Sequence, residues 1–400
     1  MNGRQFDIVL LGGGLAGGLI AAALARGRPD LSVAVVEAQP VLGGNHRWSW
    51  FESDLSPEGI ALLAPFAKTE WNGGYDVAFP GYRRTLSSSY RSLASGNFDA
   101  QLRRLLPEDA VLTGREAVTV DRAGTILDNG ERINARAVID CRGQAKSAHL
   151  SGGWQVFLGH HLRTNAPHGV ERPIIMDVTI EQVGIADPGA YRFVYVLPLS
   201  PDELFIEDTY YADSPQLDRI LLTQRIEAYC ANHGWAGELL GSETGVLPVI
   251  TGGDFVAYQA ERRAEGVARA GALGGFTHPL TSYTMPFAVE TALAIAREAD
   301  LPGEGMAAML DARAQQHWRD TGFYRLLGKM LFGAAEPAQR WRLFERFYRL
   351  PQGLIERFYA ARSTPMDQAR ILMGKPPVPV TRALGALLQK GTPMNGQESL

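Results

Sequence analysis

The first apolar pattern in the chain is a short hydrophobic run followed by glycines and an alanine-rich segment. Residues 8–11 (Ile-Val-Leu-Leu) have the length and composition of a buried strand, and helix-forming residues follow through Ala25. A second apolar run at 31–36 ends on an acid, Glu37. The pattern predicts a strand–helix–strand unit in which both strands are buried.

Residues 117–143 alternate apolar and polar positions with a period of two. Strands at 118–120, 125–127 and 132–133, with a turn at Asp128-Asn129-Gly130, predict a three-stranded meander. A buried strand then begins at Ala137 and closes on Gly143.

The middle of the chain, roughly 154–250, also alternates on a period of two. It predicts strands at 155–159, 173–178, 191–196 and 204–211. This pattern predicts an α/β protein with an antiparallel sheet inserted into a nucleotide-binding domain.

Helical patterning appears at about 215–232 and again from Pro286 to the end. It completes a predicted division into three parts. The nucleotide domain is discontinuous, at 1–150 and 265–320, the inserted substrate domain covers 151–264, and 321–400 form a C-terminal helical region facing a membrane.

The uncharged stretch 8–25 is at the lower edge of the length that spans a membrane. Alanine and glycine fill more than half of it, and no basic segment precedes it, because Arg4 is offset by Asp7. We therefore interpret it as a buried strand and helix.

Composition describes an ordinary globular chain of 400 residues, with 46% hydrophobic and 20% charged residues. The net charge of −4 gives no basic field for nucleic acid, so we expect no nucleic-acid partner. The two cysteines, Cys141 and Cys230, are too few for a disulfide framework or a cysteine-rich metal site. A reducing, cytoplasmic setting is the simplest account, and we expect no metal.

The glycines between the first strand and helix form a G-x-G-x-x-G motif at 12–17. Gly12 permits the tight turn, Gly14 lets a pyrophosphate approach the backbone, and Gly17 lets helix and strand pack closely. The phosphates would lie at a helix N-terminus, where free N–H groups favour anions. Glu37 is placed to accept hydrogen bonds from a ribose diol, so the motif predicts dinucleotide binding.

The order of these elements, with Gly43-Gly44 after Glu37, resembles the FAD-binding fold shared with aromatic hydroxylases. The resemblance implies that the first glycine motif binds the ADP half of FAD. In that fold a later segment carries a Gly-Asp pair for the ribityl chain, and the corresponding stretch 269–276 lacks the aspartate. The candidate FAD contacts are Gly12, Gly14, Leu15, Ala16, Gly17, Glu37, Gly44, Arg47, Gly143, Gly275 and Tyr283.

Several segments resemble those of lycopene cyclases of the bacterial β-cyclase type. Residues 205–209 (Phe-Ile-Glu-Asp-Thr) resemble their acidic strand motif, and 277–286 resemble their His-Pro-x-Thr-Gly-Tyr segment near the flavin. Residues 191–199 and 374–380 are also similar, so the resemblance spans about 6–380. One departure is Ser282, which replaces the glycine of the Thr-Gly-Tyr segment and disfavours a positive φ.

The resemblance implies an intramolecular lyase or isomerase that closes β-ionone rings at the ends of lycopene, giving β-carotene through γ-carotene. Nothing is oxidised or reduced overall. Reduced FAD would stabilise a carbocation, and NADPH would serve only to reduce the flavin. The expected substrates are lycopene and related carotenoids, while oligomeric state and one-end or two-end cyclisation stay open.

The resemblance places the essential carboxylate at Glu207, with Asp208 and His278 as further catalytic candidates. Adjacent residues of a strand face opposite sides, so only one of the two acids can line a pocket. Alternatively, both acids form a solvated strand edge or cap a loop. His278 is equally well explained as a structural residue of a cofactor loop, and Tyr283, Trp48 and Trp50 as packing residues.

Residues 322–362 combine aromatic and basic side chains, with eight lysines and arginines against three glutamates. Pro351 would divide them into short amphipathic helices. That composition suits a lipid interface, which predicts peripheral contact with the inner membrane. The alternative is an amphipathic bundle that covers the core.

Two other functions remain compatible with this scaffold. A flavin-dependent monooxygenase or polyprenyl reductase would consume NAD(P)H in proportion to product. A non-catalytic isoprenoid carrier would use the same fold without an active flavin.

Overall fold

The computed structural model describes residues 3–143, 147–182, 191–335, 339–373, 385–386 and 391–394. The segment 374–380, which carried part of the cyclase resemblance, lies outside the described residues.

The predicted strand–helix–strand unit is confirmed. Strand β1 (Arg4–Leu11) leads into helix α1 (Leu15–Gly27) and then into β2 (Val33–Glu37). The strands pair in parallel, with Leu11 opposite Val36. Every residue from Ile8 to Leu11 is fully buried, so the uncharged stretch is a core strand and helix, as the sequence predicts.

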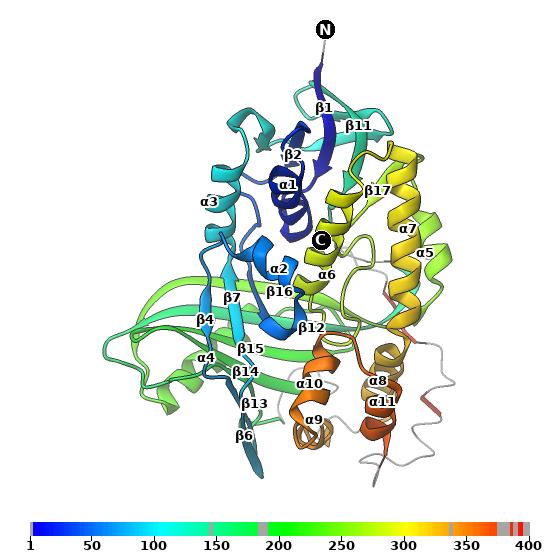
Figure 1. The fold of residues 1–400 in the computed structure, drawn as a ribbon. Helices are drawn as coiled ribbons and strands as arrows, with labels where there is room; N and C mark the ends of the chain where they lie inside the picture. The colour runs from blue at the N-terminus through cyan, green and yellow to red at the C-terminus, as the bar shows by residue number, and fades with distance from the viewer. Residues whose placement is uncertain are drawn as a thin grey trace.

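The first sheet (Figure 1) has seven strands. Its order is β8-β2-β1-β11-β10-β9, and β17 also pairs with β11. The predicted meander is confirmed, with one correction: 132–133 and 137–140 are one strand rather than two, because β11 pairs with β1 along its whole length. The remaining strands of this sheet are β8 (Val111–Thr113), β9 (Ala117–Asp121), β10 (Gly124–Leu127), β11 (Arg132–Asp140) and β17 (Val267–Arg269).

Helices cover this sheet and bury α1. The core contains Leu19, Phe98, Val289 and Met306, which come from α1, α3, α6 and α7. A side chain at Gly18 would lie 2.4 Å from the Phe98 ring, so this glycine permits the close approach of α1 and α3. The helices are α2 (Pro57–Leu63), α3 (Ser95–Leu105), α6 (Met285–Arg297) and α7 (Gly303–Asp320), and two short 3-10 helices are η1 (Glu52–Asp54) and η2 (Glu108–Ala110).

The second sheet has eight strands and lies across the lower half of the molecule (Figure 1). Its order is β16-β12-β15-β14-β13-β5-β6, with β18 beside β12. The predicted sheet is antiparallel except where β13 and β5 pair in parallel, which the sequence did not predict. The strands are β5 (Tyr75–Phe79), β6 (Tyr82–Leu86), β12 (Ser147–Thr164), β13 (Ile174–Asp177), β14 (Tyr191–Ser200), β15 (Glu203–Ala212), β16 (Gly237–Gly253) and β18 (Pro393–Met394).

The two faces of the second sheet are covered by different helices. Helix α4 (Arg219–Asn232), at the position predicted, packs with α5 (Phe255–Glu261) on the face of Leu204 and Ile206. The opposite face, with Phe205 and Tyr211, packs against aromatic residues of the C-terminal helices. Because β5 and β6 come from 75–86, the sheet also draws on residues outside 151–264, and the predicted domain boundaries stay a prediction.

A small third sheet joins the two larger ones. It has the order β3-β7-β4, with β3 (Arg47–Phe51), β4 (Thr69–Trp71) and β7 (Tyr90–Ala94). The sequence did not predict these strands. They carry the chain from the glycine-rich loop at 43–44 to the second sheet.

The C-terminal region forms short helices, as the sequence predicts. They are α8 (Gly322–Gly333), α9 (Trp341–Tyr348), α10 (Gln352–Tyr359) and α11 (Pro365–Leu372), and Pro351 separates α9 from α10. Tyr324, Tyr348, Phe358 and Tyr359 are buried, so many of these aromatics cover the core. Within the described part of the chain, no helix has both the length and the apolar character needed to span a bilayer.

Candidate active site

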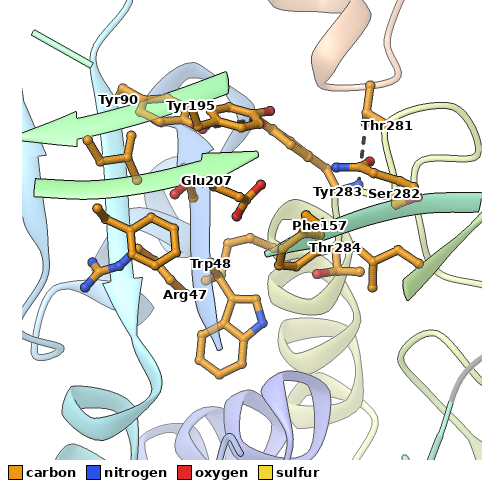
Figure 2. A pocket seen from close by; sticks show the side chains of 16 residues that line it. Arg47, Trp48, Tyr90, Phe157, Tyr195, Glu207, Thr281, Ser282, Tyr283 and Thr284 are labelled. Carbon is orange, nitrogen blue, oxygen red and sulfur yellow. Dashed lines mark hydrogen bonds between the residues drawn. The ribbon is translucent and has the colours of Figure 1, made fainter. Parts of the chain in front are cut away.

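A cavity opens where the second sheet, the small sheet and the loop before α6 meet (Figure 2). It contains about 690 Å³ of empty space, part of which is open to solvent. Its walls are mainly aromatic, and the two charged groups that line it are Arg47 and Glu207. The aromatic residues are Trp48, Tyr90, Phe157, Tyr195, Phe205 and Tyr283.

Glu207 lies on β15 and points into this cavity, between Tyr195 and Trp48 (Figure 2). Its Oε1 accepts a hydrogen bond of 2.7 Å from the Thr209 hydroxyl. Burial, with a smaller contribution from the negative charge of Glu243, raises the pKa of Glu207 to about 8. The carboxyl group is therefore largely protonated at neutral pH and can act as a proton donor.

Asp208 lies on the opposite face of β15 and does not line the cavity. The Arg192 guanidinium donates to both of its oxygens, at 2.5 to 3.0 Å, and both side chains are buried. Asp208, expected as a further catalytic candidate, is thus separated from the cavity by the sheet. The alternative of a solvated strand edge is wrong, since β15 is an interior strand between β12 and β14.

His278 is fully buried and does not line the cavity either. Its Nδ1 faces the backbone N–H groups of Leu280 and Thr281, both at 3.2 Å, so this nitrogen is the acceptor. Nε2 then carries the proton and donates to the Phe358 carbonyl at 3.1 Å. Burial lowers the pKa of His278 to about 3. The neutral ring thus links this loop to α10, which agrees with the structural alternative for His278 rather than with its expected catalytic role.

The same hydrogen bonds of His278 fix the loop 281–284, which forms one wall of the cavity. Ser282 has a φ of 57°, a conformation that favours glycine. Its hydroxyl donates to the Pro248 carbonyl at 2.8 Å, which offsets part of the strain. The loop thus keeps the left-handed turn that a glycine would make. The next residue, Tyr283, projects into the cavity, and its hydroxyl lies 3.1 Å from that of Tyr90.

The glycine motif has the shape of a phosphate cradle. Gly12 has a φ of 94°, and a side chain at Gly17 would lie 2.0 Å from the Gly12 carbonyl oxygen. A side chain at Gly14 would meet nothing within 4 Å, so the space in front of it is open. Helix α1 begins there at Leu15 and Ala16, with no side-chain cap and no acid in its first turn. This uncapped N-terminus fits a dinucleotide phosphate.

Glu37 ends β2 beside this cradle. Its Oε2 accepts from the N–H of Gly13 at 2.7 Å, and its Oε1 accepts from the N–H of Gln39 at 2.8 Å. These bonds hold the carboxylate at the carboxyl edge of the first sheet, where a ribose could reach it.

The other predicted cofactor residues follow the same edge. Gly143 comes after β11, and a side chain at Gly12 would touch the neighbouring Arg142. Gly44 and Gly275 have φ values of 65° and 86°. Arg47 lines the cavity, whereas Gly275 borders a second, smaller cavity next to Phe255. The open space at Gly14, the uncapped start of α1 and the carboxylate of Glu37 together suit the ADP half of FAD.

Sequence reasoning missed several cavity residues. Gln155, Phe157 and Tyr195 lie on strands that the alternation predicted, but the pattern does not say which face meets the cofactor domain. Tyr90 lies on a strand that was not predicted at all. The alternation of side chains within 155–159 and 191–196 was the signal that could have grouped Gln155, Phe157 and Tyr195 by strand face.

Comparison with solved structures identifies the fold class of this chain. The chain is similar to a geranylgeranyl bacteriochlorophyll reductase-like protein of Thermoplasma acidophilum, with a TM-score of 0.59 at 13% identity over 92% of this chain and 96% of the other. It is also similar to a flavin-dependent halogenase of Xanthomonas campestris, with a TM-score of 0.55 at 14% identity over 97% and 94% of the two chains. The corresponding values for the p-nitrophenol 4-monooxygenase PnpA of Pseudomonas putida are 0.55 and 14%, over 90% and 99%. The fold is therefore the FAD-binding, Rossmann-like fold of the aromatic hydroxylase type.

Sequence relatives identify the family. A family model described as lycopene cyclase protein matches residues 7–385. The chain is 44% identical to a lycopene beta-cyclase of Pseudescherichia vulneris over 96% of this chain and 97% of the relative. It is 40% identical to a lycopene beta-cyclase of Pantoea ananas over 96% and 98%. The chain belongs to the lycopene cyclase family, which confirms the predicted resemblance.

Alanine substitutions at Gly14 and Gly17 distinguish an effect on stability from an effect on FAD affinity. Gly17→Ala pushes a methyl group into the Gly12 carbonyl, and we expect it to lower the free energy of unfolding by more than about 2 kcal/mol. Gly14→Ala has open space and a φ of −67°, so the stability of the apoprotein should change by less than about 0.5 kcal/mol. The same methyl group blocks the phosphate, and FAD affinity should fall at least about tenfold. Denaturant unfolding and FAD fluorescence titration measure both, and unchanged FAD affinity in Gly14→Ala would contradict the cradle.

Ser282 tests how the strained turn is compensated. Ser282→Ala loses the bond to Pro248 but keeps the positive φ, so we expect a loss of about 1 to 2 kcal/mol of stability. Ser282→Gly loses the same bond but relieves about 1 kcal/mol of backbone strain, so its stability should stay close to that of the wild type. Thermal unfolding compares the two variants, and equal losses would show that the turn is unstrained.

Proposed function

We propose that this protein is a lycopene β-cyclase that forms β-ionone rings at the ends of lycopene, giving β-carotene through γ-carotene. The observation that carries the proposal is Glu207, a largely protonated carboxyl group in an aromatic cavity of a chain that belongs to the lycopene cyclase family.

The proposed reaction moves protons but no net electrons. A proton adds at C2 of the substrate end, which leaves a cation at C1. The C5=C6 double bond attacks C1 and closes the ring, and the new cation at C5 loses a proton from C6. Catalysis therefore requires an acid, a base and surroundings that favour positive charge.

Glu207 is the proposed acid, because its raised pKa keeps the proton on the carboxyl group until the substrate arrives. After the transfer, Glu207 is a carboxylate in a low-dielectric cavity, where it attracts the new cation and can accept the C6 proton. One side chain then returns to its starting state in each cycle.

The aromatic walls support the same chemistry. The rings of Trp48, Tyr90, Tyr195 and Tyr283 line the same cavity as Glu207, and aromatic faces stabilise cations. They also provide the apolar surface that a hydrocarbon substrate needs. We propose that the cavity holds one end of the substrate while the rest of the polyene extends through the opening.

We propose that FAD binds through the glycine cradle at 12–17 and Glu37. When bound, FAD in its reduced, anionic form would supply a fixed negative charge beside the developing cation, with NADPH as the reductant that forms it. Arg47, Gly44, Gly143, Gly275 and Tyr283 are further proposed contacts.

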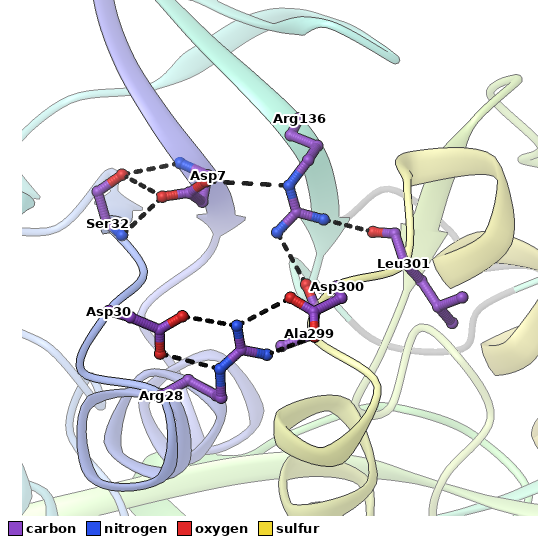
Figure 3. A network of polar contacts seen from close by, with 8 residues as sticks. All are labelled: Asp7, Arg28, Asp30, Ser32, Arg136, Ala299, Asp300 and Leu301. Carbon is purple, nitrogen blue, oxygen red and sulfur yellow. Dashed lines mark hydrogen bonds and ion pairs between the residues drawn. The ribbon is translucent and has the colours of Figure 1, made fainter.

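In this proposal, 1–150 and 265–320 bind the cofactor and 151–264 bind the substrate. Contacts between the two cofactor segments support the division (Figure 3). Arg28 bridges Asp30 and Asp300, and Arg136 donates to two carbonyls of the turn between α6 and α7. These bonds tie the end of α1 and strand β11 to the later segment.

The decisive experiment is expression in cells that accumulate lycopene. A change from red lycopene to β-carotene supports the proposal, and unchanged lycopene with bound FAD contradicts it. With purified protein under anaerobic conditions, a cyclase converts many lycopene molecules per flavin reduced. A monooxygenase or reductase would instead consume NAD(P)H in proportion to product.

Glu207→Gln removes the proton but keeps the shape of the side chain. We expect cyclisation to fall by at least about 10³-fold, while FAD binding stays at the wild-type level. Because the acid form is active, wild-type activity should be constant below the pKa of about 8 and fall as the pH rises above it. Product formation measured from acid to alkaline pH checks both, and a variant that retains activity would rule out Glu207 as the acid.

We also propose peripheral contact with a membrane, where lycopene dissolves. On and just after α11, Met366 and Met373 are 76% and 66% exposed, and Arg370 and Leu372 are exposed between them. Apolar side chains next to a basic residue suit the surface of an anionic bilayer.

Flotation with anionic liposomes tests this contact. The full chain should float at low salt, and Met366→Asp combined with Met373→Asp should leave it at the bottom. Val256→Asp, at a position on α5 that is 69% exposed, is the matched control and should still float. Equal flotation of all three proteins would place the contact elsewhere, and wild-type protein that does not float would rule it out.

A further inference from the structure

A second acid lies on the same face of the second sheet as Glu207. Gly159 of β12 pairs with Glu207 of β15 on one side and with Glu243 of β16 on the other. Side chains of paired residues lie on the same face of a sheet. Two strand spacings put the Cα atoms of the two glutamates about 10 Å apart, and their side chains share one apolar surface.

The glycine between the two acids leaves room for an aromatic ring. A side chain at Gly159 would lie 2.3 Å from the ring of Phe205, which covers this position. Phe205 also lines the cavity. The space between the acids is therefore filled by hydrocarbon rather than by water, which strengthens the interaction of their charges.

Two basic side chains lie beside Glu243. Its side chain is buried, and Oε1 lies 3.6 Å from Nδ1 of the half-exposed His46. The Arg47 guanidinium interacts electrostatically with Glu243, and it lies 5.4 Å from the centre of the Phe205 ring. His46 and Arg47 thus lie on one side of the buried Glu243 side chain.

The charged and titratable groups around Glu207 differ in how they affect its pKa. From β15 itself, Asp208 adds a negative charge that Arg192 largely neutralises. From β7, β14 and the loop before α6 come the uncharged hydroxyls of Tyr90, Tyr195 and Tyr283. The β3 segment contributes Arg47 and His46, which lie on the side of Glu243. After burial, Glu243 is the largest influence that raises the pKa of Glu207.

We propose that Glu243 is a positioning residue whose negative charge keeps the proton on Glu207 and favours the positive charge that develops in the cavity. This inference rests on the proposed function of Glu207 as the acid. It assigns no contact between Glu243 and the substrate, since Glu243 does not line the cavity.

Glu243→Gln removes the charge and keeps the size of the side chain. Because the acid form of Glu207 loses a stabilising neighbour, the alkaline limb of the pH–activity profile should move down by roughly 0.5 to 1 pH unit. At pH 8, kcat should fall about two- to sixfold, with KM unchanged. Glu243→Asp should restore most of the wild-type profile.

Glu238→Gln is the matched control, because Glu238 is also on β16 but is 71% exposed and pairs only with Arg163 at the surface. It should leave the profile unchanged. His46→Lys gives a second test should Glu243→Gln not fold, because a fixed positive charge beside Glu243 should move the limb in the same direction. Infrared titration of the Glu207 carboxyl, identified by its loss in Glu207→Gln, should show the same shift in the absence of substrate.

The outcomes separate this inference from the proposed function. If the wild type cyclises lycopene and neither Glu243→Gln nor His46→Lys moves the limb or the infrared titration, the inference is wrong and the cyclase proposal stands. If the wild type forms no cyclic product while the infrared titration still shifts, the electrostatic coupling holds and the proposed function fails.

Discussion

Strand β15 places two adjacent acids on opposite faces of one sheet, and the site depends on this separation. On one face, Asp208 is buried with Arg192, and the pair is a fixed, neutralised part of the core. On the other face, Glu207 opens into an aromatic cavity and forms no ion pair among the described residues. Strand β15 thus carries both Asp208, which forms an ion pair in the core, and Glu207, whose carboxyl group keeps its proton because it is buried. If both acids lay on one face, Arg192 could neutralise the acid that we propose as the proton donor.

The cavity is assembled from parts that are distant in the sequence. Its floor is the second sheet, its side wall is the small sheet that follows the glycine-rich loop at 43–44, and its remaining wall is the loop before α6. His278 fixes that last wall through three backbone contacts, and Ser282 adopts a left-handed conformation within it. Buried polar groups that are fully hydrogen-bonded make such a loop rigid. A rigid wall is needed to position a hydrocarbon substrate, because its reacting carbons offer no polar groups that could form hydrogen bonds with the protein.

The electrostatic field in this site arises from few charges, which lie among apolar and aromatic side chains. Glu207, Glu243 and Arg47 lie around the Phe205 ring, with hydrocarbon between them. Charges separated by hydrocarbon influence one another more strongly than they would in water. An acid that must protonate a double bond benefits from such surroundings, because the same negative field that opposes its ionisation also lowers the energy of the cation it creates.

Features that depend on local periodicity and chain geometry could be predicted from the amino-acid sequence. The glycine motif with its flanking strands, the meander, helix α4 and the placement of Glu207 and Asp208 on opposite sides of a strand all follow from short-range rules. Long-range packing sets which face of β15 lines the cavity, because either face of an interior strand can be buried. It also determines that β5 and β6 join the second sheet, that His278 is enclosed by α10, and that Glu243 lies across Gly159 from Glu207. These contacts join residues far apart in the chain, and pairing between distant strands is set by packing rather than by the local pattern of side chains.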